Sequence, residues 1–139
     1  MTTLRLGFLK LGPQIRNLEL EFHTLGTLYL HNNKIQLIAD DFFESMPNLK
    51  FLALQDNQIE EWFDVRGLTQ LEFLDLRNNK LPPNGVENLP ENLVVLKLQG
   101  NPLCAENGKY GYRREFVAGL PELTELDKIE VQTAERLHY

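Results

Sequence analysis

The sequence predicts an α/β solenoid, in which short parallel strands stack into one sheet and short helical or 3₁₀ turns return along the opposite face. Two observations predict this fold class. A frame of leucines and asparagines recurs along most of the 139-residue chain. Each copy also contains a Leu-x-Leu pair, and a spacing of two is typical of a strand with one buried face. We therefore expect a right-handed coil of similar units, closed at its C-terminal end by a helical cap.

The frame is L-x-x-L-x-L-x-x-N-x-L/I, and its four complete copies occupy residues 25–103. Its asparagines are Asn33, Asn57, Asn79 and Asn101, so successive copies are 24, 22 and 22 residues apart. This frame and these intervals are typical of leucine-rich repeats. The asparagines are expected to be structural, because a side-chain amide after each strand can satisfy backbone groups of its own coil and of the neighbouring coil.

Residues 1–24 are interpreted as a degenerate first repeat. Met1, Leu4, Leu6 and Leu11 fit the frame at an interval of 24 residues, but Leu9 stands where the asparagine belongs. The alternative is an irregular N-terminal segment.

The segments between the strands are expected to be short and irregular. The run Leu81-Pro82-Pro83-Asn84-Gly85 excludes a continuous helix, because proline lacks an N–H donor and restricts the residue before it. Asp40 and Asp41 precede Phe42 and could cap one helical turn. Trp62 and Phe63 are expected to be part of the core, with a second contact surface as the alternative.

The C-terminal cap is predicted over residues 104–131, followed by a tail at 132–139; residues 1–131 are expected to form a single domain. A solenoid needs an atypical end unit to cover its core. The helix is expected to close near Gly119, with Arg113, Arg114 and Glu115 facing water. The predicted apolar residues of the cap lie on one helical face and in the segment after it. They are Tyr112, Phe116, Leu120, Leu123 and Leu126.

The sequence Asn101-Pro102-Leu103, followed from Tyr112 by Y-R-x-x-F-V-x-x-L-P-x-L-x-x-L-D, resembles a known family. This is the group of leucine-rich-repeat proteins of the protein-phosphatase-1-regulator type, with their shared C-terminal cap. The group includes a phosphatase regulator, a spliceosomal A′ subunit, acidic nuclear phosphoproteins and axonemal proteins such as an outer-arm dynein light chain. The segments at 15–19 and 28–36 are most similar to the small axonemal members. The resemblance implies binding rather than catalysis.

Composition argues against several classes of function. A net charge of −6 disfavours direct binding of nucleic acid or of an anionic membrane. No apolar run is long enough to span a bilayer. Cys104 is the only cysteine and so excludes an internal disulfide, and we expect a partly buried structural thiol. His23, His31 and His138 lack metal-ligand spacing. No metal, cofactor or small-molecule substrate is expected.

The candidate site is the concave face of the sheet, formed by the residues between the strand leucines. Equivalent positions stack into columns about 4.8 Å apart. Apolar side chains from adjacent strands are expected to form a ridge with a polar rim, which is typical of a binding site. Stiffening of the sheet by the same side chains is the alternative. The candidate residues are Tyr29, His31, Phe51, Phe73, Asp75, Arg77, Val95 and Lys97.

The function predicted from these observations is a non-catalytic protein-interaction adaptor, within an axonemal or cytoskeletal complex. The expected partner is a protein segment, with an amphipathic helix as the specific version. The alternatives are a subunit of a nuclear ribonucleoprotein or of a phosphatase-regulatory complex. The expected location is intracellular, in the cytoplasm or cytoskeleton (including a cilium or flagellum), with the nucleus as the alternative. No acid, base or nucleophile constellation indicates an enzyme.

Overall fold

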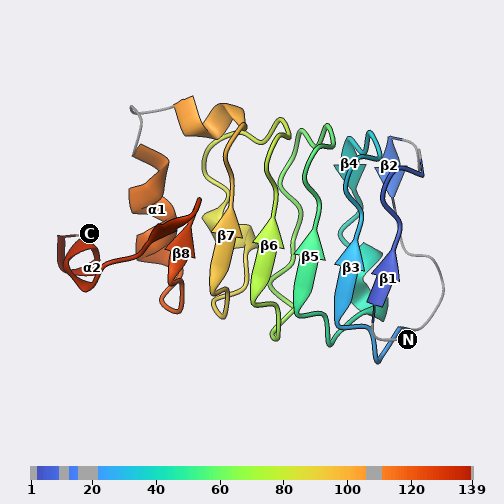
Figure 1. Cartoon of the computed structure of the whole chain (residues 1–139), viewed down its shortest axis with the longest axis horizontal. Helices are drawn as coiled ribbons and strands as arrows, with labels where there is room; N and C mark the ends of the chain where they lie inside the picture. Colours follow the sequence, from blue (N-terminus) through green and yellow to red (C-terminus); the bar gives the residue numbers. More distant parts are fainter. Residues whose placement is uncertain (1–2, 10–12, 16–21, 106–110, 139) are drawn as a thin grey trace.

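A computed structural model describes residues 3–9, 13–15, 22–105 and 111–138. Its central feature is a seven-stranded sheet whose strands follow one another in chain order along the molecule (Figure 1). Five of these strands are parallel and three residues long: β1 (Thr3–Arg5), β3 (Thr27–Tyr29), β5 (Phe51–Ala53), β6 (Phe73–Asp75) and β7 (Val95–Lys97). Strands β8 (Glu125–Leu126) and β9 (Ile129–Glu130) complete the sheet at the cap.

The register of the sheet confirms the repeat frame. Leu28 pairs with Leu52, and Leu74 pairs with Leu96, so equivalent residues of successive repeats lie side by side. Strand β1 pairs with β3 in the same way, with Leu4 opposite Leu28. Strand β1 thus adds one strand ahead of the first complete repeat, while Met1 and Leu11 lie outside the described residues and the degenerate repeat over 1–24 stays a prediction.

The return segments are short, as the prolines and irregular spacing predict. They contain β2 (Gln14–Ile15), which pairs with β4 (Leu37–Ile38), and three 3₁₀ helices: η1 (Phe42–Ser45), η2 (Val86–Asn88) and η3 (Pro102–Ala105). Asp41 occupies the N-cap of η1 but makes no side-chain capping hydrogen bond, so the expected capped turn is a 3₁₀ helix without that cap.

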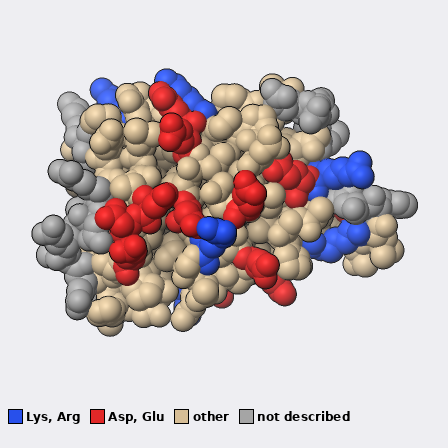
Figure 2. All heavy atoms as spheres, turned by 180° about the vertical axis from the view of Figure 1, so that it is seen from behind, with Lys and Arg blue, Asp and Glu red and all other residues tan. Residues whose placement is uncertain are grey.

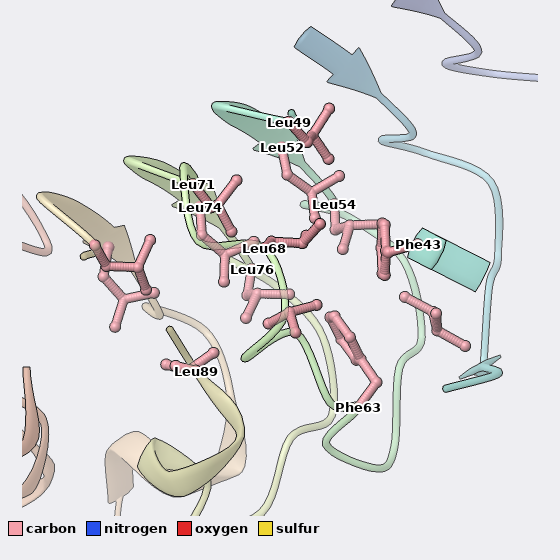
Figure 3. Close-up of a cluster of buried hydrophobic side chains, with 14 of the residues drawn as sticks. Phe43, Leu49, Leu52, Leu54, Phe63, Leu68, Leu71, Leu74, Leu76 and Leu89 are labelled. Carbon is pink, nitrogen blue, oxygen red and sulfur yellow. The ribbon is translucent and has the colours of Figure 1, made fainter. Parts of the chain in front are cut away.

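One hydrophobic core runs the length of the described repeats. The strand leucines Leu28, Leu52, Leu74 and Leu96 are completely buried. Figure 3 shows leucines of neighbouring coils directed toward one another, with Phe43 and Phe63 filling the side of the return segments. Burial of a leucine side chain contributes about 2 kcal/mol, so this continuous cluster is the main source of stability.

Trp62 lies at the edge of this core and is partly buried against it. Its indole Nε1 donates a hydrogen bond to the Pro82 carbonyl at 2.7 Å. The ring packs so closely on the backbone of Gly85 that a Cβ there would lie 1.8 Å from it. Any larger residue at position 85 would displace the indole.

The cap consists of α1 (Gly111–Gly119), the strands β8 and β9, and α2 (Thr133–His138), which lie together at one end of the sheet (Figure 1). The helix ends at Gly119 as predicted. Phe116, Leu120, Leu123 and Leu126 are buried, and Tyr112 is half-buried against the core.

Two expectations about the cap require correction. Arg113 does not face water: it is 7% exposed, and its guanidinium forms an ion pair with Glu135, with an Nε–Oε2 distance of 2.7 Å. Residues 132–139 include helix α2, which is held on the cap by this ion pair and by Arg136. The Arg136 guanidinium donates to the carbonyls of Val117, Leu120 and Leu123 at 2.7–2.9 Å. The expected tail is therefore largely a folded element.

Candidate functional site

The candidate site starts from the asparagines that hold the strands in register. The Asn57 amide nitrogen donates to the carbonyls of Leu30 and Leu54, each at 3.0 Å, and thus joins two coils. Its oxygen accepts the backbone N–H groups of Asn33 and Ile35. Asn79 and Asn101 donate to two coils in the same way. These bonds fix the strand spacing, and hence the spacing of the side chains on the concave face.

The residue before each asparagine bends the chain away from the strand. Asn32, Asp56, Asn78 and Gly100 all have positive φ, between 56° and 82°. Glycine, asparagine and aspartate tolerate this left-handed conformation better than other residues do. The sequence places these residue types at the position, but the repeat frame alone does not reveal the requirement.

An aromatic ladder, formed by Tyr29, Phe51 and Phe73, crosses the concave face. The rings of Phe51 and Phe73 are stacked, with centroids 4.2 Å apart and planes 3° from parallel. Tyr29 packs against Phe51 at 5.4 Å between centroids. All three side chains are half-buried, so they are supported by the sheet while part of each remains accessible. The predicted apolar ridge is thus a contiguous structure, continued by half-buried Val95 on β7.

A cation lies at each end of the ladder. The Arg5 guanidinium carbon is 4.7 Å from the centre of the Tyr29 ring, and Lys97 Nζ is 5.5 Å from the centre of the Phe73 ring. Both distances are within the range of cation–π attraction. Lys97 was among the predicted site residues, whereas Arg5 was not, although its position in the same column as Tyr29 was readable from the sequence.

Asp75 and Arg77 form a pair instead of two independent rim charges. Asp75 is 3% exposed and accepts three charge-assisted hydrogen bonds from the Arg77 side chain: Nε–Oδ1 at 3.0 Å, Nε–Oδ2 at 3.1 Å and Nη2–Oδ2 at 2.7 Å. The hydrogen bond to Asp75 is the main cause that raises the pKa of Arg77. Asp75 is therefore placed to orient Arg77, and only the partly exposed Arg77 can meet a partner directly.

His31 lies next to the ladder but is enclosed by neighbouring groups. Its ring meets Tyr29 and Phe8 edge-on, at 6.1 and 5.3 Å between centroids. A Cβ on Gly7 would lie 2.6 Å from His31 Nε2, so the glycine makes room for the ring. Within the described residues no group of three or more His, Cys, Asp or Glu side chains is arranged to hold a metal ion.

The cap closes the hydrogen-bond ladder with an aspartate, which sequence reasoning did not assign. Asp127 Oδ1 accepts the backbone N–H groups of Leu98 and Gln99, at 2.5 and 3.1 Å. The Tyr112 hydroxyl donates to Asp127 Oδ2. Cys104 Sγ donates to the Leu98 carbonyl at 3.1 Å, and burial raises the pKa of this thiol. The sequence signal for the role of Asp127 is the Leu-Asp pair that ends the cap motif.

Acidic side chains gather on the face seen in Figure 2, with few lysines or arginines among them. The return segments supply exposed carboxylates on the side opposite the concave face. They include Asp40, Asp41, Glu44, Glu61 and Glu87. The two cations at the ends of the aromatic ladder therefore contrast with the negative charge of the rest of the molecule.

Comparison with known proteins supports the fold. Residues 23–81 match the family model described as leucine rich repeat. The fold is similar to that of a chain in the crystal structure of the Drosophila melanogaster SNF/U2A′ complex, with a TM-score of 0.70 and 22% sequence identity. The match covers 90% of this chain and 76% of that chain. At this identity the likeness shows the fold alone. Among the described residues, no helix has the length and hydrophobicity needed to cross a membrane.

Three curated relatives indicate the range of proteins that share these repeats. The chain is 33% identical over 115 residues to a probable U2 small nuclear ribonucleoprotein A′ of Caenorhabditis elegans, covering 83% of this chain and 37% of that protein. It is 40% identical over 142 residues to dynein axonemal assembly factor 11 of Danio rerio, covering 84% and 31%. Lumican of Mus musculus is 38% identical over 85 residues, covering 58% and 24%. The chain thus spans about a third or less of the length of these relatives.

Proposed function

We propose that this chain, a leucine-rich-repeat protein with a C-terminal cap, is a non-catalytic adaptor that binds a protein partner on its concave face. The observation that carries the proposal is the aromatic ladder. Three half-buried rings from three adjacent strands form one continuous apolar surface in the centre of the sheet. Aromatic residues in such a position are the usual anchors of protein interfaces.

The polar residues around the ladder suit recognition better than catalysis. Arg77 is fixed by Asp75, and His31 is enclosed by rings. We assign partner contact to Tyr29, Phe51, Phe73, Val95, Arg77 and Lys97, with His31 and Asp75 in supporting positions.

The specific version of the proposal is an intracellular adaptor within an axonemal or cytoskeletal complex, binding an amphipathic helix. The 40% identity to a dynein axonemal assembly factor supports it. The alternative is a subunit of a nuclear ribonucleoprotein, which the similarity to a U2 ribonucleoprotein A′ supports. A phosphatase-regulatory complex is the further alternative. We treat residues 1–131 as one functional domain.

The test compares protein partners recovered by the wild-type chain and by a Phe51→Ala, Phe73→Ala double variant. Affinity purification followed by mass spectrometry should recover axonemal or dynein components with the wild type and lose them with the variant. Leu137→Ala is the control, because Leu137 is 81% exposed and lies in the cap, away from the ladder. Circular dichroism must show that the double variant is folded.

The outcomes distinguish the alternatives. If the wild type recovers spliceosomal proteins and the double variant loses them, the chain is a subunit of a ribonucleoprotein and the concave face is still its binding site. Partners that remain bound to a folded double variant would show that the ladder only stiffens the sheet, and would overturn the proposal.

A further inference from the structure

Each end of the aromatic ladder carries a cation that contacts the terminal ring. Five adjacent strands, β1, β3, β5, β6 and β7, each contribute one residue to a series across the sheet. In order, these residues are Arg5, Tyr29, Phe51, Phe73 and Lys97. The distances between neighbouring members are 4.7, 5.4, 4.2 and 5.5 Å. Each is close to one strand spacing, and four spacings separate the two cations by about 19 Å.

The two terminal cations differ from Arg77, whose charge is compensated by an ion pair with Asp75. Arg77 is neutralised by Asp75, and coulombic interactions with Asp56 and Asp127 also raise its pKa. Arg5 is exposed and Lys97 is half-buried, and within the described residues no ion pair shorter than 4.0 Å involves either of them. The aromatic ladder therefore has one cation at each of its two ends, and beyond Lys97 the sheet continues to Glu125 on β8.

We infer that the partner is an amphipathic helix that lies across the strands and carries one acidic residue near each end of its apolar face. Complementary charges at the rim of an interface fix its orientation and register. On a helix, residues on one face recur every 3.6 positions with a rise of 1.5 Å per residue. Acidic residues about 11 to 14 positions apart lie on one face, and their separation of about 16 to 21 Å matches that of Arg5 and Lys97.

A single-stranded nucleic acid fits this face less well. Proteins that bind single strands use aromatic rings on which bases stack, with positive charge along the whole path. Here the Phe51 and Phe73 rings stack on each other at 4.2 Å, which leaves no space for a base between them. The chain also has a net charge of −6.

This inference rests on the proposed function, and designed peptides can test it separately. The probes are amphipathic peptides of about 20 residues with one Leu/Phe face. They carry Glu, Gln or Lys at two positions 14 residues apart, and a fourth peptide has its two Glu residues only about 7 apart. Fluorescence anisotropy with the full chain should show binding of the first Glu peptide about tenfold tighter than the Gln peptide, with a difference that decreases in high salt. The closely spaced Glu peptide should lose most of this advantage.

Charge reversal provides the second arm of the experiment. The Arg5→Glu, Lys97→Glu double variant should lose its preference for Glu and bind the Lys peptide best. Arg66→Glu combined with Lys80→Glu makes the same change in net charge at exposed positions outside the concave columns, and should keep the wild-type order. An exchanged preference in the first variant alone supports a direct contact.

Failure of this inference differs from failure of the proposed function. Equal binding of the Glu and Gln peptides, or no binding of any peptide, would overturn the charge rule. If the Phe51→Ala, Phe73→Ala variant still loses its cellular partners, the proposed function stands without that rule. Binding of a single-stranded RNA oligomer that disappears with Arg5→Glu, Lys97→Glu would replace the helix by an anionic polymer and would also overturn the inference.

Discussion

At the scale of single residues, the fold depends on polar side chains that are buried because they join two coils. The Asn57 side chain makes five hydrogen bonds to backbone groups in its own and the preceding coil. The Leu9 backbone N–H donates to Asn33 Oδ1 at 2.9 Å, so the asparagine of the following coil also binds the coil in which leucine stands at this position.

The raised pKa values of Tyr112 and Cys104 predict that the folded chain loses stability at alkaline pH. Burial raises the pKa of both groups, and the hydrogen bond to Asp127 raises that of Tyr112 further. The folded chain therefore holds both protons more tightly than the unfolded chain does. This stabilisation is complete below about pH 8.5, and it declines as the pH rises past the unfolded values of about 8.5 for the thiol and about 10 for the phenol.

Urea unfolding between pH 7 and pH 11 checks this expectation. The free energy of unfolding of the wild type should fall steeply above about pH 10. Tyr112→Phe should be less stable at pH 7 by about 1 kcal/mol, because it removes the hydrogen bond to Asp127, but it should decline less steeply above pH 10. Parallel curves for the two proteins would show that Tyr112 does not cause the alkaline loss.

At the scale of elements, the cap is held by arginines rather than by its apolar face alone. Arg113 reaches from α1 to Glu135 on α2 and to the carbonyls of Leu126 and Glu130 in the adjoining strands. Arg136 binds three carbonyls at and after the end of α1, where a helix leaves acceptors unpaired and favours positive charge. Two reciprocal contacts thus lock α1 and α2 together.

The substitution Arg113→Met should destabilise the chain by about 3 kcal/mol, because it leaves the Glu135 carboxylate and several carbonyls without their buried cation. Lys128→Met is the control, since Lys128 is exposed, lies in the cap and carries the same charge. It should change the free energy by less than about 0.5 kcal/mol. Denaturant unfolding measures both. Equal effects of the two substitutions would contradict the structural role of Arg113.

At the scale of the whole molecule, the repeated features were predictable and the unique ones were not. Leucines and asparagines occur in the same frame four times, so each copy supports the prediction from the others, and the sheet register follows directly. The apolar ridge followed from the alternation of strand residues. The burial of Arg113 did not, because its partner is 22 residues away and no periodicity connects the two. The Asp75–Arg77 pair likewise depends on side-chain conformations that a frame does not encode.

The continuous core predicts that damage in one coil affects the whole chain. Leu74 is completely buried in the middle of the sheet, and Leu74→Ala should lower the free energy of unfolding by about 3 kcal/mol. Circular dichroism reports all coils, whereas fluorescence reports Trp62, which packs beside Phe116 of the cap. Both midpoints should shift together. A shift in circular dichroism without a shift in fluorescence would indicate that the coils unfold independently.

Because the strands are in uniform register, the number of strands determines the width of the concave face. Duplicating a single 22-residue coil would move one end of the face outward by one strand, about 4.8 Å. That step corresponds to about three residues of a bound helix. The number of coils therefore sets the length of ligand that the concave face can hold. Evolution or design could change that length by adding or removing whole coils while the contacts within each coil stay the same.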